Sequence, residues 1–170
     1  MKIGILGGSF NPPHLGHFHL SKLALQKLNL DQIWWIVTEK NPLKNSRDYE
    51  SYAARTQKCL SLTNNHPKIR IVNFSEIYTQ KLIARLRKKY PQHQFTFVAG
   101  ADILAQIHRW KNFKKIIATI DLAIFAREEF LLKSQKFPSW KFIKNANRFR
   151  FFFTQKNPLS STKIRKYEYC

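Results

Sequence analysis

Acidic side chains are scarce in this sequence. Its 170 residues contain 10 Asp and Glu against 30 Lys and Arg, for a formal net charge of +20. Such an excess of cations indicates either a polyanionic partner, such as nucleic acid or a phosphate-rich substrate, or lysines that fill solvated positions. The cations are spread along the chain, and the densest run, Arg85, Arg87, Lys88 and Lys89, falls on the outer face of a predicted helix. We therefore favour solvated lysines and expect no nucleic-acid partner.

Cysteine and long apolar runs are also lacking. Cys59 and Cys170 alone make neither a disulfide framework nor a metal cluster. No apolar run approaches the ~20 residues that cross a bilayer, and residues 1–8 indicate a first strand instead of a signal peptide. We expect a cytoplasmic protein with no membrane contact and one domain over residues 1–170, a length that buries a sizeable core. The sequence leaves open whether the chain forms a homo-oligomer.

The two common glycine-rich phosphate motifs, paired carboxylates and a Ser-His-Asp arrangement are absent as well. The sequence has instead Gly-Gly-Ser-Phe-Asn-Pro-Pro-His-Leu-Gly-His at residues 7–17, after the apolar run 3–6 and before a helical apolar pattern. Glycines let a backbone approach an anion closely, and the start of a helix attracts negative charge. We therefore predict a phosphate-binding turn, with a helix that begins near His14 and carries His14 and His17 on one face.

Strands and helices alternate along the rest of the chain. We predict strands at 2–6, 33–37, 69–72, 95–98, 122–125 and 149–153, and helices at 14–28, 49–62, 78–89, 103–107, 113–118 and 163–167. The second helix is expected to turn Tyr52, Ala53, Thr56 and Leu60 inward, and the stretch 127–147 is poorly patterned. This alternation predicts an α/β fold of the Rossmann-like type, a doubly wound and mostly parallel sheet with helices on both faces.

Ligands of such a sheet lie beyond the carboxyl ends of its strands, so the loops there should converge. The polar residues that these loops carry are His14, His17, Lys44, Asp102, Ser160, Ser161, Thr162 and Arg165. A zinc site that adds His19 to the two histidines is disfavoured, because no thiol or carboxylate lies nearby and His17 and His19 point to different faces. We expect no metal bound directly by the protein.

Two motifs carry a resemblance to a known superfamily. Residues 7–17 match the Gly-x-Phe-(Asp/Asn)-x-x-His-x-Gly-His pattern of the nucleotidyltransferases, and residues 160–165 resemble their Ser-Ser-Thr-x-Ile-Arg element. Within it the chain most closely resembles the bacterial nicotinate-nucleotide adenylyltransferases. The further segments that agree are Trp34–Val37 with Asn41–Lys44, Tyr78-Thr79, Gly100-Ala101-Asp102-x-Leu104 and His108–Phe113.

The resemblance implies that ATP adenylylates nicotinate mononucleotide, giving nicotinate adenine dinucleotide and pyrophosphate for NAD biosynthesis. It implies catalytic roles for His14, His17, Lys44 and Arg165. It implies ATP binding by Gly7, Gly8, Ser9, Phe10, Gly100, Asp102, Ser160, Ser161 and Thr162. It implies a pyridine pocket of Tyr78, Thr79 and Trp110. Mg²⁺ is expected, held mainly by the ATP phosphates.

Several alternatives stay open. Taken alone, Ser160–Thr162 would cap the terminal helix and Trp110 would pack in the core. Lys81 stands where the family has Asp, which leaves the choice between nicotinate and nicotinamide mononucleotide open. Phosphopantetheine adenylyltransferase shares the expected fold. A basic nucleic-acid-binding module is the alternative from another class, and it would need clustered cations with exposed aromatic rings.

Overall fold

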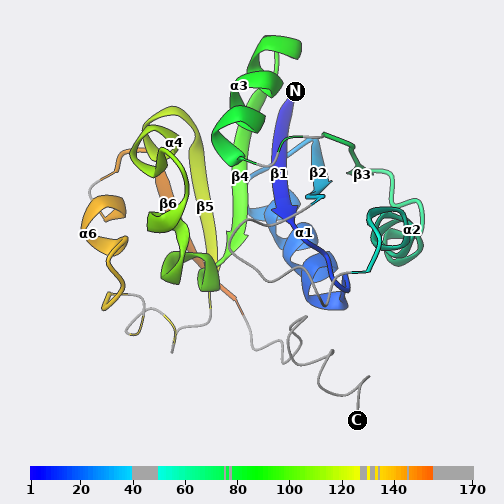
Figure 1. Cartoon of the computed structure of the whole chain (residues 1–170), viewed down its shortest axis with the longest axis horizontal. Coiled ribbons are helices and arrows are strands. Elements are labelled where there is room, and N and C mark those ends of the chain that lie inside the picture. The colour runs from blue at the N-terminus through cyan, green and yellow to red at the C-terminus, as the bar shows by residue number, and fades with distance from the viewer. Residues whose placement is uncertain are drawn as a thin grey trace.

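A parallel sheet forms the centre of the protein (Figure 1). The computed structural model describes residues 1–39, 50–74, 76, 78–126, 130, 133, 135–144 and 146–154. Its six strands lie in the order β3-β2-β1-β4-β5-β6, and every neighbouring pair is parallel. They are β1 (Lys2–Gly8), β2 (Gln32–Val37), β3 (Ile69–Ile71), β4 (Gln94–Gly100), β5 (Asp121–Ala126) and β6 (Phe149–Phe153). The predicted Rossmann-like sheet is confirmed.

Helices cover both faces of this sheet. They are α1 (Leu15–Lys27), α2 (Tyr52–Thr63), α3 (Thr79–Lys89), α4 (Phe113–Thr119) and α6 (Trp140–Ile143), with the 3₁₀ turns η2 (Ala101–Ala105) and η3 (Ile107–Arg109). One core cluster joins Trp34 of β2 to Leu82 of α3 and Ile116 of α4. The other joins Trp35 to Ala24 of α1 and Cys59 of α2. Because both faces are buried, β2 is apolar from Ile33 to Val37, as expected of a central parallel strand.

The strand order places the reversal of the sheet at β1. β2 and β3 lie on one side of it, and β4, β5 and β6 lie on the other. The loops that follow β1 and β4 therefore leave neighbouring strands at the same edge. This is where parallel α/β sheets bind their ligands.

Two local predictions were wrong. Ala53 and Leu60 of α2 are exposed, and the buried positions are Arg55, Cys59 and Thr63. A charged residue takes an inner position here because backbone carbonyls satisfy its guanidinium. The helix predicted at 103–107 is instead two short 3₁₀ turns, η2 and η3.

The prediction for the basic run of the third helix holds. The basic run at the end of α3 is exposed, as predicted. The poorly patterned stretch 127–147 contains the short helix α6, while the helix predicted at 163–167 lies outside the described residues. Within the part of the chain that the structure describes, no helix combines the length and apolarity needed to span a membrane.

Candidate phosphate-binding site

The turn after β1 is made by a phenylalanine. Gly7 and Gly8 are the last residues of the strand, and none of the described glycines has a positive φ. Phe10 instead has φ 45°, in the left-handed region that non-glycine residues adopt at a cost of about 1–3 kcal/mol. Its ring is almost fully buried and stacks on Trp35 at a centroid distance of 4.9 Å, and this packing supports the turn.

Two imidazoles lie together where α1 begins, as the spacing predicted. The His14 and His17 ring centroids are 3.8 Å apart, and His14 is the N-cap residue of the helix. The His17 N–H donates to the His14 carbonyl at 2.9 Å, and the His14 N–H donates to His17 Nδ1 at 3.2 Å. Because His17 Nδ1 accepts a hydrogen bond, neutral His17 carries its proton on Nε2, which can then donate.

His14 is neutral at physiological pH. Its Nδ1 is buried and has no hydrogen-bond partner among the described residues. Burial lowers the pKa of His14 from 6.5 to about 4, because the charged form loses its hydration. His14 therefore presents a polar ring and no full positive charge to an anion at the start of the helix.

A chain of hydrogen bonds fixes the first turn of α1 to the sheet. The Trp35 indole N–H donates to Ser21 Oγ at 2.7 Å, and the Ser21 hydroxyl donates to the His17 carbonyl at 2.8 Å. The Phe10 ring lies 4.8 Å from the His17 ring. The orientation of His17 is thus determined by the strand, the turn and the helix together.

The loop after β4 lies next to this turn in the sheet. Gly100 ends β4 and Asp102 lies in η2, and the family resemblance implies that both contact the nucleotide. A Cβ atom added at Gly100 would lie 2.7 Å from Asp102 Oδ1, so glycine leaves room for that carboxylate to fold back. Asp102 is exposed, and it lies at the edge of the sheet from which the loop after β1 also leaves.

The three predicted pyridine-pocket residues lie on adjoining segments. Tyr78 and Thr79 begin α3, and Trp110 follows η3. The Asn112 amide donates to Gln80 Oε1 at 2.8 Å, and Lys111 Nζ lies 4.9 Å from the Tyr78 ring centroid. Trp110 packs edge-on against Phe97 with centroids 5.8 Å apart. Lys81, at the position of the family's Asp, is exposed.

Five further predicted site residues belong to segments 40–49 and 155–170. These are Lys44, Ser160, Ser161, Thr162 and Arg165, and they lie outside the described residues. Their roles remain predictions from sequence.

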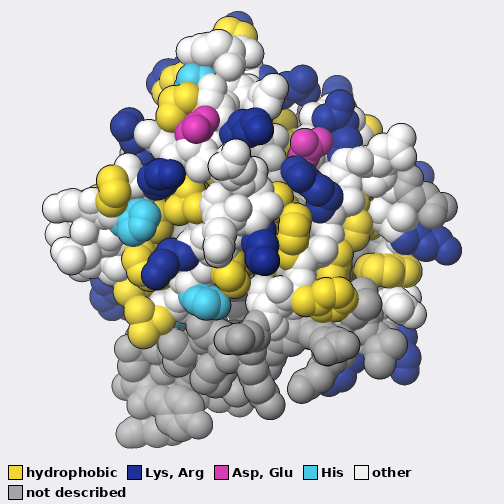
Figure 2. Space-filling model, turned by 180° about the vertical axis from the view of Figure 1, so that it is seen from behind, with side chains coloured by type: hydrophobic (Ala, Val, Ile, Leu, Met, Phe, Trp, Pro, Cys, Tyr) yellow, Lys and Arg dark blue, Asp and Glu magenta, His cyan; other side chains and the backbone are white. Residues whose placement is uncertain are grey.

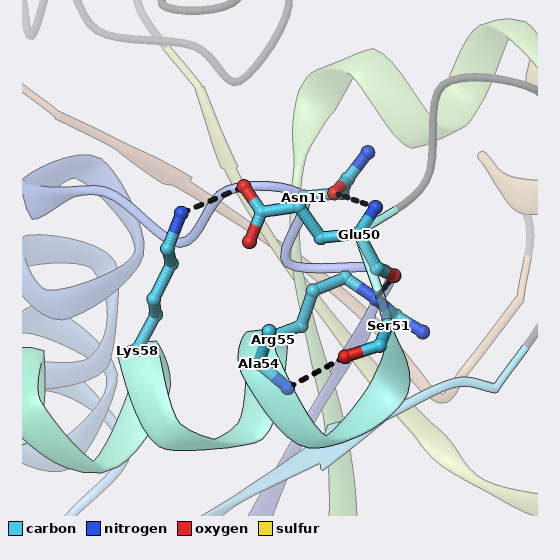
Figure 3. A network of polar contacts seen from close by, with 6 residues as sticks. All are labelled: Asn11, Glu50, Ser51, Ala54, Arg55 and Lys58. Carbon is cyan, nitrogen blue, oxygen red and sulfur yellow. Dashed lines mark hydrogen bonds and ion pairs between the residues drawn. The ribbon is translucent and has the colours of Figure 1, made fainter.

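Sequence reasoning missed Arg55 of α2. This residue is 1% exposed, and its guanidinium donates to the carbonyl of Ser9 in the β1 turn and to those of Thr38 and Glu39 after β2. Figure 3 shows Arg55 beside Glu50 and Asn11. The available indication was its spacing: Arg55 lies three residues after Tyr52 and four before Cys59, on the inner stripe of the helix. An arginine on such a stripe indicates a buried hydrogen-bonding role.

On the face that Figure 2 draws, Lys and Arg side chains are scattered among apolar and uncharged ones and form no single patch. Within the described ranges, no group of three or more His, Cys, Asp or Glu side chains could hold a metal ion.

Comparisons with known proteins identify the family of this chain. Residues 5–167 match the model of the family described as cytidylyltransferase-like. A probable nicotinate-nucleotide adenylyltransferase of Ruegeria sp. (strain TM1040) is 41% identical over 131 residues, 75% of this chain and 68% of that protein. One of Cereibacter sphaeroides (strain ATCC 17025) is 38% identical over 143 residues, 82% of this chain and 76% of its own. The structure of Plasmodium falciparum nicotinic acid mononucleotide adenylyltransferase complexed with NaAD has a TM-score of 0.78 at 21% identity, covering 98% and 83% of the two chains.

Proposed function

This chain belongs to the cytidylyltransferase-like family, among its nicotinate-nucleotide adenylyltransferases, and we propose that it joins the adenylyl group of ATP to nicotinate mononucleotide. A 5′-phosphate oxygen of the mononucleotide bonds to the α-phosphorus of ATP, and the bond from that phosphorus to the β-phosphate oxygen breaks. Nicotinate adenine dinucleotide and pyrophosphate result, a step of NAD biosynthesis. The nucleophile is already an anion at neutral pH, so the reaction needs no general base.

The observation that carries this proposal is the pair of imidazoles at the start of α1. His14 and His17 lie within 3.8 Å of each other, measured between ring centroids, at the carboxyl end of β1. Their ring N–H groups and the helix N-terminus would bind phosphate oxygens that gain negative charge as pyrophosphate leaves. At His14 the donor is neutral, because the pKa of about 4 keeps its ring uncharged.

The remaining proposed roles follow the sequence motifs. Lys44, Ser160, Ser161, Thr162 and Arg165 would complete the phosphate site from segments 40–49 and 155–170. Gly7, Gly8, Ser9 and Phe10 would contact the nucleotide through backbone atoms, with Gly100 and Asp102 on the adenosine side. Mg²⁺ would bind mainly to the ATP phosphates and neutralise part of their charge.

Tyr78, Thr79 and Trp110 would hold the pyridine ring. An aromatic face is a suitable wall for a flat, electron-poor ring. The contact of Asn112 with Gln80 supports this grouping, because it joins the start of α3 to the segment that carries Trp110. We also propose that the pocket prefers a nicotinate ring to a nicotinamide ring.

Pyrophosphate release from ATP tests the proposal. The purified protein is given nicotinate mononucleotide, nicotinamide mononucleotide or phosphopantetheine in parallel, with Mg²⁺ present. We expect the highest kcat/KM with nicotinate mononucleotide. Faster release with nicotinamide mononucleotide would reverse the ring preference, faster release with phosphopantetheine would replace the acceptor, and no release with any of the three would overturn adenylyl transfer.

A further inference from the structure

The most deeply buried charge that the structure describes lies beside the proposed phosphate turn. Arg55 projects from α2 and is 1% exposed, whereas Lys58, one turn later on the same helix, has a side chain that is 50% exposed. Burial of a guanidinium costs free energy unless its donors are satisfied. The arginine is therefore held in this position by specific partners.

Those partners are backbone carbonyls from separate segments of the chain. Arg55 Nε donates to the Glu50 carbonyl at 3.0 Å, and Nη2 donates to the Glu39 carbonyl at 3.0 Å. Nη1 donates to the Thr38 carbonyl at 2.9 Å and also to the Ser9 carbonyl. One planar group thus joins the β1 turn, the end of β2 and the residues before α2.

Further bonds hold the same junction. The Thr38 N–H donates to the Gly8 carbonyl at 2.9 Å, and the Glu50 N–H donates to Asn11 Oδ1 at 3.2 Å (Figure 3 shows the second bond). Glu39 and Glu50 flank segment 40–49 in the sequence, the segment that contains Lys44. The carbonyl groups that accept hydrogen bonds from Arg55 therefore include those of the residues directly before and directly after that segment.

The Ser9 carbonyl is the link to the imidazoles. Ser9 directly precedes Phe10, whose left-handed backbone turns the chain toward α1. The Phe10 ring then contacts the His17 ring at 4.8 Å. A shift of the Ser9 peptide would therefore move Phe10, and the rigid Phe10 ring would in turn move His17.

We infer that Arg55 is a positioning residue for phosphate transfer: its guanidinium holds the β1 turn against the chain that ends β2 and begins α2, and so orients His17 toward the ATP phosphates. This inference rests on the proposed function. Arginine suits the task because its donors lie in a fixed planar fork, which the flexible ammonium of lysine does not reproduce. The acceptors are carbonyls, so the bonds depend on geometry more than on an ion pair.

The test compares Arg55→Lys with Cys59→Ala. Cys59 is fully buried one turn further along α2 and gives a matched loss of packing away from the junction. We expect Arg55→Lys to lower kcat for pyrophosphate release at least tenfold at equal folded fraction, with KM for ATP changed less than threefold. Cys59→Ala should keep kcat within twofold. Equal kcat losses in the two variants would overturn the positioning role.

A double-mutant cycle with His17→Ala separates positioning from general loss of structure. If Arg55 acts through His17, Arg55→Lys should cost less than threefold in the His17→Ala background. Losses that multiply fully would contradict the inference. Wild-type protein without pyrophosphate release would instead reject the proposed function.

Folding of the variants is checked by circular dichroism and urea unfolding. If Arg55→Lys does not fold, Arg55→Gln, which is uncharged and keeps an amide donor, takes its place with the same expected kcat loss. Failure of both variants to fold would reduce Arg55 to a stabilising residue and overturn the positioning role.

Discussion

Trp34 and Trp35 are neighbours on β2, yet only one of them supports the proposed site. Trp34 packs on the α3 side with Tyr90, His93 and Phe95, at centroid distances of 5.2, 6.3 and 5.9 Å. Its indole N–H bonds to Gln32 Oε1, two residues away on the same strand. This cluster of a tryptophan, a histidine and other rings lies toward the amino end of β4.

The Trp35 side chain lies on the opposite face of the sheet and forms a cluster of rings similar in composition to that of Trp34. It contacts Phe10 at 4.9 Å and His17 at 6.0 Å, and its indole N–H bonds to Ser21 on α1. The difference is where the rings lie and what the polar bonds join. The Trp35 cluster connects three elements at the carboxyl end of β1, where a helix N-terminus is available to an anion. Placement and connectivity, more than residue type, therefore distinguish a site from a structural cluster.

The largest expected effect is that of a substitution at His17, and the same substitution at His93 is its comparison. His17→Ala should lower kcat/KM for pyrophosphate release about 10²–10³-fold, about 3–4 kcal/mol, which is the value of a preorganised donor to developing charge. His93→Ala should stay within about twofold when rates are corrected for folded fraction, because His93 belongs to the Trp34 cluster. Similar losses in both variants would remove the distinction between the clusters.

The pH dependence of stability gives the next effect. The His14 pKa of about 4 lies below the unfolded value of 6.5. Between these pH values the unfolded chain binds a proton that the folded chain excludes, so the free energy of unfolding falls as the pH drops through this window. After allowance for partial exposure we expect a contribution of about 2 kcal/mol.

Urea unfolding of wild type and His14→Gln at pH 7 and pH 4.5 measures this contribution. The stability of the variant should fall by about 2 kcal/mol less than that of wild type over the same change. An equal fall in both proteins would show that burial of His14 does not exclude its proton.

The smallest expected effect on activity comes from the tryptophans themselves. Trp34→Phe and Trp35→Phe each remove one indole hydrogen bond and leave some space, for a stability loss of about 1–3 kcal/mol in thermal unfolding. Trp35→Phe should also lower kcat/KM several-fold, because Phe10 and the first turn of α1 lose support. If Trp34→Phe lowered kcat/KM as much as Trp35→Phe, support of the site would not be particular to Trp35.

The sequence predicted the sheet and the histidine pair because both depend on local patterns. Apolar strands buried on two faces are visible in the chain, and a three-residue spacing at a helix start brings His14 and His17 together wherever the helix lies. The motif resemblance then indicated the reaction. The roles of Lys44 and of Ser160 to Arg165 remain predictions.

The carbonyl partners of Arg55 and the left-handed backbone of Phe10 were not predicted, because both depend on contacts between distant segments. Arg55 is stable inside because carbonyls from Ser9, Thr38, Glu39 and Glu50 meet around it, and these residues come together only in the folded chain. The sequence pattern therefore predicted the wrong face of α2 to be buried. Phe10 makes the left-handed turn because Trp35 and His17 hold its ring, although two glycines precede it in the chain.

The central claim is that the imidazoles at the start of α1 bind the ATP phosphates. Nuclear magnetic resonance of ¹⁵N-labelled histidine rings tests it, with His14, His17 and His93 assigned from single His→Gln variants. On titration with a non-hydrolysable ATP analogue and Mg²⁺, the ring nitrogens of His14 and His17 should shift with one saturation curve while those of His93 stay fixed. Saturating binding that leaves the His14 and His17 rings unmoved would contradict the account.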